Sequence, residues 1–195
     1  MRKITIVGGG QSGLQLGLGL LKNGYQVRVV QNRTGEEIAK GKVLSSQCMF
    51  DNAMQNERDL GIDFWSDRCP PVEGIQFVVP DPEGSGNKAI EWAGRLDKPA
   101  FSVDQRVKMP KWLDEFEKLG GNLVIAEAGI ADLEAYARQD DLVLVASGKG
   151  DVGRLFAEKQ EHDSGQDFED GDSLALIGLG DPADSVGKHL VANQF

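Results

Sequence analysis

The sequence has few of the side chains on which metal sites and nucleophilic catalysis depend. It contains two cysteines, Cys48 and Cys69, and two histidines, His162 and His189. Two cysteines cannot build a disulfide framework or a four-thiolate metal site. Two histidines exclude a histidine-rich metal centre and leave few candidates for a Ser-His-Asp triad. We therefore expect no metal site and no catalytic residue of these classes.

Positive charge and long apolar runs are also scarce. The 195 residues include 21 Lys and Arg against 31 Asp and Glu, which gives a net charge of −10. Nucleic acids and anionic membranes select basic surfaces, so neither is an expected partner. No apolar run is long enough to cross a bilayer, and the opening MRKITIVGGG lacks the features of a secretory signal. The sequence favours a soluble, cytoplasmic protein.

Glycine, in contrast, is abundant, and three glycines form a motif near the N-terminus. A short β-branched strand over residues 3–7 leads into Gly8-x-Gly10-x-x-Gly13, a leucine-rich helix and a second strand over residues 25–30. In such a βαβ unit, Gly8 permits a tight turn, Gly10 lets the backbone approach a pyrophosphate, and Gly13 lets helix and strand pack closely. Phosphates would meet the N–H groups at the start of the helix. This context favours dinucleotide binding over a glycine turn without a ligand.

The rest of the chain alternates strands with helices. This alternation predicts an α/β fold with a Rossmann-like, doubly wound parallel sheet in a single domain over residues 1–195. A small β-hairpin insertion is expected around the turn PDPEGSGN. The acidic stretch 158–172 is typical of a solvated linker or loop. Further helices are expected over residues 34–40, 51–61, 102–119 (starting late or kinked at Pro110) and 130–138, and further strands over 75–79, 88–92, 122–126, 141–146 and 173–177.

The end of the second strand leaves the choice of dinucleotide open. The acidic residue that usually reads the ribose is missing there, and Gln31 or Asn32 could bond a ribose hydroxyl instead. Arg33 could face a phosphate or the adenine of FAD, or the 2′-phosphate of NADP. A second motif, Gly180-Asp181 after the strand 173–177, favours FAD, because flavoproteins of the hydroxylase type use such an Asp to bind the ribityl chain. An ordinary turn is the alternative for this dipeptide.

Taken in order, these motifs resemble the oxygenase component of styrene and indole monooxygenases, a group of FAD-dependent aromatic hydroxylases. The resemblance runs from residue 1 to about residue 156 and resumes at about residue 173. The segments that carry it are ITIVGGGQSGLQLGLGLLKNGYQVRVV, NRTGEEIAKGKVLSSQ, SVDQRVKMPKWLDEFEKLGG, DLVLVASGKG and LIGLGD.

The resemblance implies FAD as cofactor and assigns residues to it. Members of this group receive reduced FAD from a separate flavin reductase and use O₂ to epoxidise a small aromatic substrate. They need no catalytic acid or base from the protein, because the flavin carries the chemistry. The implied cofactor-binding residues, together with Gln31, are Gly8, Gly10, Gln11, Ser12 and Gly13 at the pyrophosphate, Arg33 and Lys42 near the adenosine and phosphates, Arg106 facing the cofactor, Ala146, Ser147 and Gly148 at a strand end, and Asp181 at the ribityl chain.

The chain also departs from this group. Where its members carry a large substrate-binding domain, this sequence has only the acidic stretch 158–172. We therefore expect an FAD-binding core without its substrate domain, with apolar surface that favours a homodimer. Two alternatives are a non-catalytic FAD-binding module and a small NADP-dependent reductase. The Gly-Asp motif and the lack of a Tyr-x-x-x-Lys pair count against the reductase.

Overall fold

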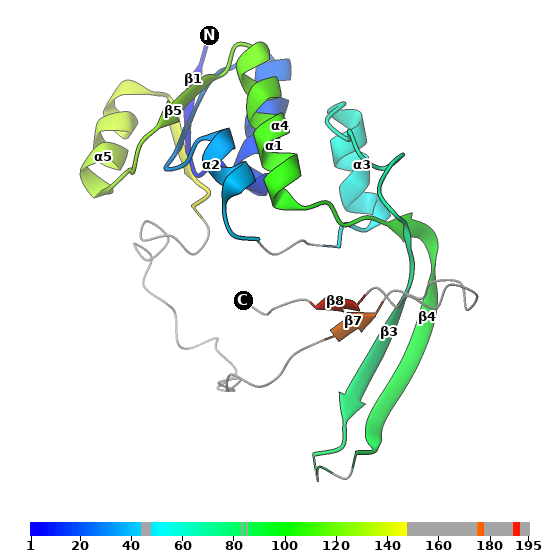
Figure 1. Ribbon diagram of the computed structural model, residues 1–195. Helices are drawn as coiled ribbons and strands as arrows, with labels where there is room; N and C mark the ends of the chain where they lie inside the picture. The colour runs from blue at the N-terminus through cyan, green and yellow to red at the C-terminus, as the bar shows by residue number, and fades with distance from the viewer. Residues whose placement is uncertain (44–47, 83, 85, 148–174, 178–188, 192–195) are drawn as a thin grey trace. The chain divides into compact units, whose positions relative to one another are not determined.

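The computed structural model describes residues 1–43, 48–82, 84, 86–147, 175–177 and 189–191 (Figure 1). The chain divides into two compact units, and each is considered by itself. The first unit combines Met1–Leu44 with Gln105–Ser164, and the second combines Ser45–Asp104 with Gly165–Phe195. None of the helices in the described ranges is both long and apolar enough to cross a membrane.

A four-stranded parallel sheet forms the centre of the first unit. Its order is β5-β2-β1-β6, so β1 lies between β2 and β6. Val7 at the end of β1 pairs with Val30 on one side and with Val145 on the other. Apolar, β-branched residues suit such strands, because neighbouring elements cover both faces of a parallel sheet. The strands are β1 (Lys3–Val7), β2 (Gln26–Gln31), β5 (Asn122–Ile125) and β6 (Leu142–Val145).

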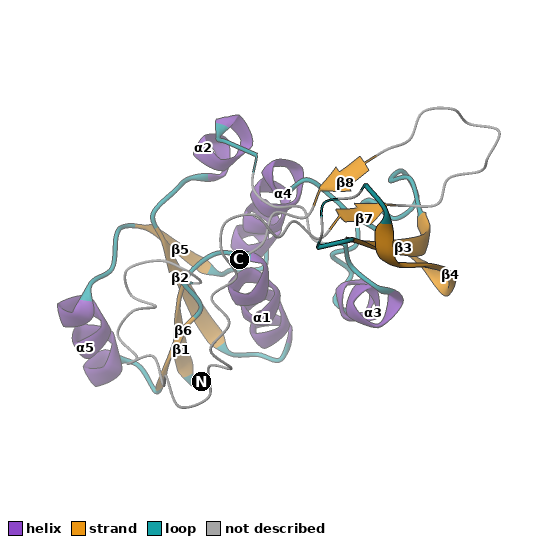
Figure 2. Ribbon diagram, turned by 90° about the horizontal axis from the view of Figure 1, so that it is seen from below, coloured by secondary structure: helices purple, strands orange, loops and turns teal. Residues whose placement is uncertain are grey.

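Helices lie on both sides of this sheet, which confirms the expected doubly wound α/β fold. Figure 2 shows α5 (Ile130–Gln139) on one side and α1 (Gln11–Lys22) with α4 (Gln105–Lys118) on the other. Trp112 and Phe116 of α4 are fully buried. A Cβ on Gly17 of α1 would lie 3.1 Å from the Phe116 ring, so the bare glycine lets the two helices pack closely. The helix α4 starts late, at Gln105 instead of residue 102, and continues through Pro110.

The short helix α2 (Gly35–Lys40) begins at a capping box formed by Thr34 and Glu37. The backbone N–H of Glu37 donates to the Thr34 hydroxyl at 3.2 Å, and the Glu37 carboxylate accepts from the Thr34 N–H at 2.7 Å. The bond from the Thr34 backbone, followed by that from its hydroxyl, holds the pKa of Glu37 below its usual value. Local sequence alone is therefore enough to start this helix after β2.

A buried polar cluster joins the sheet to the end of α5. Asp140 follows α5, and its carboxylate accepts from the Thr5 hydroxyl at 2.6 Å and from the Arg28 guanidinium. The same guanidinium lies 4.7 Å from the centre of the Tyr136 ring. Burial of the Asp140 carboxyl opposes its ionisation. The bonds from Thr5 and Arg28 outweigh that effect, and the pKa of Asp140 is lowered.

Replacing Asp140 with Asn should lower the free energy of unfolding by about 2 kcal/mol at pH 7, because the Arg28 guanidinium loses its buried counter-charge. A lowered folded-state pKa stabilises the fold above the unfolded-state value of about 4, and this contribution is lost as the pH falls through the folded-state pKa. Urea unfolding of wild type and Asp140→Asn should therefore differ at pH 7 and converge at acid pH. Glu134→Gln, which removes an exposed ion pair on α5, is the control. A gap that persists at acid pH would contradict the assignment.

The second unit contains a helix and a separate antiparallel sheet. The sheet order is β4-β3-β7-β8. The predicted hairpin is confirmed and is longer than expected, because β4 continues past Gly94 through an irregular stretch before Ala100 pairs with Val72. The elements are α3 (Asp51–Asp59), β3 (Val72–Pro80), β4 (Lys88–Ala100), β7 (Ala175–Ile177) and β8 (His189–Val191).

The strand expected over residues 173–177 does not belong to the parallel sheet. The strand that forms there, β7, pairs antiparallel with β3 and β8. A short apolar run fits the edge of either sheet, and its side chains do not specify which edge it joins. Sequence alternation therefore identified the strand and not its partner.

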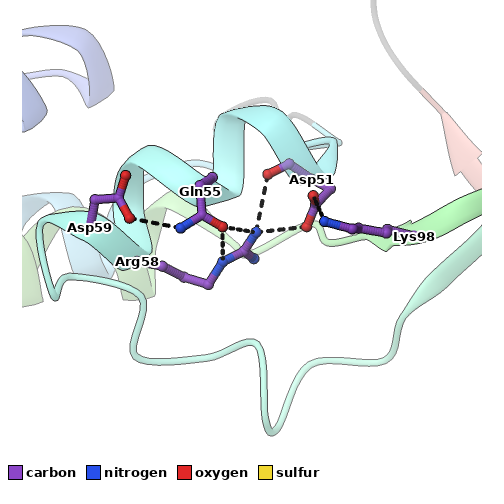
Figure 3. A network of polar contacts seen from close by, with 5 residues as sticks. All are labelled: Asp51, Gln55, Arg58, Asp59 and Lys98. Atoms are coloured by element: carbon purple, nitrogen blue, oxygen red, sulfur yellow. Dashed lines mark hydrogen bonds and ion pairs between the residues drawn. The ribbon is translucent and has the colours of Figure 1, made fainter.

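Within the second unit, one carboxylate ties α3 to the hairpin (Figure 3). Asp51 at the start of α3 accepts from the Arg58 guanidinium at 2.6 Å and from the Lys98 ammonium of β4 at 2.8 Å. Gln55 extends this network, because it bonds both Arg58 and Asp59. The bond from Lys98 is the main cause of the lowered pKa of Asp51. This contact fixes the irregular part of β4 against the helix.

Candidate dinucleotide-binding site

The turn between β1 and α1 is held against the neighbouring strands by backbone contacts. The N–H of Gly8 donates to the carbonyl of Val30 at 2.8 Å. Gly8 has a φ of 117°, and a Cβ there would lie 2.2 Å from the carbonyl oxygen of Ala146. Only glycine fits, because the left-handed backbone and the close approach each exclude a side chain.

The other two glycines of the motif have different surroundings. A Cβ on Gly13 would lie 1.9 Å from the carbonyl oxygen of Gly8, whereas a Cβ on Gly10 would meet nothing within 4 Å. Gly13 therefore permits the helix to pack on the turn, and Gly10 leaves an open backbone surface. These are the roles expected of the second and third glycines in a dinucleotide turn.

The start of α1 suits an anion. Gly10 is the N-cap residue, no side chain caps the helix there, and its first turn contains no acid. The N–H groups of this turn form the positive end of a helix of 12 residues. Ser12 is exposed in the same turn, and Gln11 accepts a bond from Gln105 Nε2 at 3.0 Å. The first turn of α4 is thereby joined to the first turn of α1.

Gln31, the last residue of β2, contacts both the glycine turn and the loop that follows β2. Its side chain is largely buried, and its amide N–H donates to the carbonyl of Arg33 at 2.5 Å. The other side of the amide faces the turn, because a Cβ on Gly9 would lie 1.9 Å from Gln31 Oε1. Asn32 and Arg33 are exposed beyond it. Gln31 therefore positions both the glycine turn and the loop that carries Arg33.

The end of β6 contributes a buried polar group to this edge of the sheet. The hydroxyl oxygen of Ser147 is buried and has no hydrogen-bond partner within the described part of the chain. A buried polar atom without a partner costs about 1–3 kcal/mol, which a bound group could recover. Together with the open backbone at Gly10 and the uncapped start of α1, this hydroxyl fits a polar ligand such as a dinucleotide.

These residues meet at one edge of the parallel sheet. The glycine turn follows β1, Gln31 ends β2, and Ala146 and Ser147 follow β6. These three strands are neighbours in the sheet, and open α/β sheets bind ligands at the carboxyl ends of their strands. The structure therefore brings together the predicted pyrophosphate turn, Gln31 and the strand end with Ala146 and Ser147.

The remaining predicted residues are less closely joined. Arg33 and Lys42 are exposed, and Arg106 lies in the first turn of α4 beside Gln105. Gly148 and Asp181 lie outside the described residues. Sequence reasoning missed Gln105. The helix was expected to begin at residue 102, and an uncharged amide within a helix carries no signal of its contact with Gln11.

Comparisons with known proteins agree with this geometry. The chain resembles styrene monooxygenase StyA. It is 29% identical over 178 residues to StyA of Pseudomonas fluorescens and, to the same extent, to StyA of a Pseudomonas species. Each match covers 91% of this chain and 41% of the relative, so the chain spans less than half the length of StyA. No family model matches the chain.

Two solved structures share the fold. A tetrameric form of 2-methyl-3-hydroxypyridine-5-carboxylic acid oxygenase is 17% identical, with a TM-score of 0.50 over 66% of this chain and 32% of that structure. CmlS, a flavin-dependent halogenase, is 16% identical, with a TM-score of 0.50 over 67% of this chain and 24% of that structure. At these identities the likeness concerns the fold alone.

The different surroundings of Gly13 and Gly10 predict different effects of alanine on stability. Gly13→Ala should lower the free energy of unfolding by about 3 kcal/mol, because the added methyl overlaps the Gly8 carbonyl. Gly10→Ala should change it by less than about 1 kcal/mol, because the methyl enters open space. Denaturant unfolding followed by circular dichroism measures both. Equal losses in the two variants would contradict this description of the turn.

Proposed function

We propose that this chain binds FAD, with the diphosphate at the turn between β1 and α1. The observation that carries the proposal is the combination at one sheet edge of an open Gly10 backbone, an uncapped helix start and a buried Ser147 hydroxyl without a partner among the described residues. Similarity to StyA over 91% of the chain favours a flavin over other dinucleotides.

The chain's own residues would divide the work of holding FAD. Main-chain N–H groups from Gly10 to Gly13 would bond the diphosphate, and the Ser147 hydroxyl would bond the adenosine half. Arg33 and Lys42 follow β2, and their positive charges would attract the diphosphate of a dinucleotide. Arg106 would face the cofactor from α4. Gly148 and Asp181 complete the proposed set, Asp181 at the ribityl chain.

The proposed activity is that of an oxygenase component. When bound and reduced, the flavin would supply the electrons for the reaction with O₂, and the chain would bind it, orient it and limit its contact with water. No side chain is assigned as a catalytic acid or base. A separate flavin reductase would deliver reduced FAD, and a small aromatic compound with an alkene would be the substrate.

A second candidate is a non-catalytic FAD-binding module. The observation that favours it is that the chain matches only 41% of the length of StyA. A third candidate is an NADP-dependent reductase, which is favoured by the exposed Arg33 and by the lack of an acid at the end of β2. Binding and turnover are therefore separate claims that need separate tests.

FAD binding should depend on Gly10 and not on glycine caps in general. Titration of the protein into FAD should quench flavin fluorescence, and Gly10→Ala should weaken the affinity at least about tenfold, or 1.4 kcal/mol, because the methyl blocks the approach of the diphosphate. The matched control is Gly129→Ala, because Gly129 is the N-cap residue of α5 and a Cβ there would make only an ordinary contact, 3.8 Å from Asp132 Oδ2.

Three results of this titration would count against FAD with its diphosphate at the Gly10 turn. They are an unchanged affinity in Gly10→Ala, an equal loss in Gly129→Ala, and preferential binding of NADPH. The last would favour the reductase and assign Arg33 to the 2′-phosphate.

Turnover separates the oxygenase from the binding module. The protein is mixed with a flavin reductase, NADH, FAD, O₂ and styrene, and styrene oxide and hydrogen peroxide are both quantified. Epoxide above the level formed by the reductase alone supports the oxygenase, and Gly10→Ala should lower its yield when FAD is limiting. Peroxide without epoxide, from protein that binds FAD, supports the module.

A further inference from the structure

The peptide unit between Arg33 and Thr34 is held on both sides by side chains. Its carbonyl oxygen, which belongs to Arg33, accepts from Gln31 Nε2 at 2.5 Å. Its N–H, which belongs to Thr34, donates to Glu37 Oε2 at 2.7 Å. Gln31 is the last residue of β2, and Glu37 lies in the first turn of α2. Two directional bonds on one peptide plane therefore fix the orientation of the loop that joins the strand to the helix.

The amide of Gln31 also has a contact on its other side. A Cβ on Gly9 would lie 1.9 Å from Gln31 Oε1, so this oxygen lies directly against the backbone of the glycine turn. Only 9% of Gln31 is exposed, and its backbone carbonyl accepts from the N–H of Ala126 beyond β5. One buried side chain therefore sets the spacing between the turn proposed for the diphosphate and the loop that carries Arg33.

The charged groups of this loop differ in exposure to a ligand. The bonds from the Thr34 backbone and hydroxyl lower the pKa of Glu37, and the positive charge of Arg33 lowers it further. The Glu37 carboxylate is therefore ionised at neutral pH and is engaged at the start of α2. Arg33 is exposed, and a guanidinium presented on a fixed backbone can bond a phosphate or stack on an adenine.

We propose that Gln31 and Glu37 are positioning residues, which hold the Arg33–Thr34 peptide and thereby place Arg33 at the adenosine half of FAD. This inference rests on the proposed function and gives Gln31 a role other than contact with the ribose. The two roles predict opposite effects of a carboxylate at residue 31. The residue that bonds the ribose is usually an acid, so a carboxylate would serve at least as well as the amide. A carboxylate that faces the Arg33 carbonyl instead loses a hydrogen bond and brings two acceptors together.

Titration of FAD with Gln31→Glu at two pH values separates these roles. At about pH 8.5 the variant should bind FAD at least about tenfold more weakly than wild type, because its carboxylate cannot donate to Arg33. At about pH 5.5 its affinity should return to within about threefold of wild type, because burial raises the pKa of the introduced carboxyl and its protonated form donates an O–H. Arg33 and Glu37 keep their charges over this range, since the pKa of Glu37 is lowered. The control is Gln26→Glu, which changes an exposed amide at the start of the same strand.

A double-mutant cycle measures the coupling between Gln31 and Arg33. Gln31→Met keeps the length of the side chain and removes its hydrogen bonds. Arg33→Ala should weaken FAD binding about tenfold in wild type and less than about threefold in Gln31→Met, because the loop then no longer holds the guanidinium in place. Glu37→Gln keeps an oxygen that accepts from Thr34 and should retain the affinity for FAD, whereas Glu37→Ala should lower it.

The outcomes separate this inference from the proposed function. Wild-type protein that does not quench FAD fluorescence would overturn both. If wild type binds FAD, the positioning role alone is overturned by undiminished affinity of Gln31→Glu at about pH 8.5, by a loss that persists at about pH 5.5, or by additive effects of Gln31→Met and Arg33→Ala. The cycle decides the matter even if Gln31→Glu fails to fold, because Gln31→Met introduces no charge.

Discussion

The candidate site depends on one contact, between the glycine turn that follows β1 and the end of β6. Gly8 adopts a left-handed backbone and approaches Ala146 so closely that no side chain fits between them. This approach fixes where α1 starts, and so it fixes where the N–H groups of its first turn point. It also brings Ser147 to the same sheet edge. The close approach of the two backbone segments thus places the uncapped start of α1 and the buried Ser147 hydroxyl at one sheet edge.

Several elements followed from sequence because their causes are local. The three glycines lie in a strand–turn–helix context, and Thr34 with Glu37 forms a capping box from residues three positions apart. Their conformations depend on neighbours within a few residues, which a sequence displays directly.

The features that were missed depend on distant contacts. Gln31, a candidate with Asn32 for a ribose hydroxyl, also supports Gly9 and the Arg33 carbonyl through its amide, and its contact with Gly9 exists only once β2 lies beside the turn. Gln105 reaches Gln11 across 94 residues of sequence. The strand β7 belongs to the antiparallel sheet. The sequence did not indicate this, because an apolar run of three residues does not specify its partner strand. Long-range pairing decides such cases, and no local pattern reports it.

The two ends of the parallel sheet perform different tasks. At the amino end of β6, Asp140 and Asp141 bond Thr5, Arg28 and the backbone of Lys3, so a network of charges clamps β1, β2 and β6 together. At the carboxyl end of the same strand, Ala146 and Ser147 belong to the candidate site. Because the clamp and the candidate site share no side chain, substitutions that change ligand preference leave the clamp intact. A scaffold divided in this way can exchange one bound molecule for another over evolution without first losing its ability to fold.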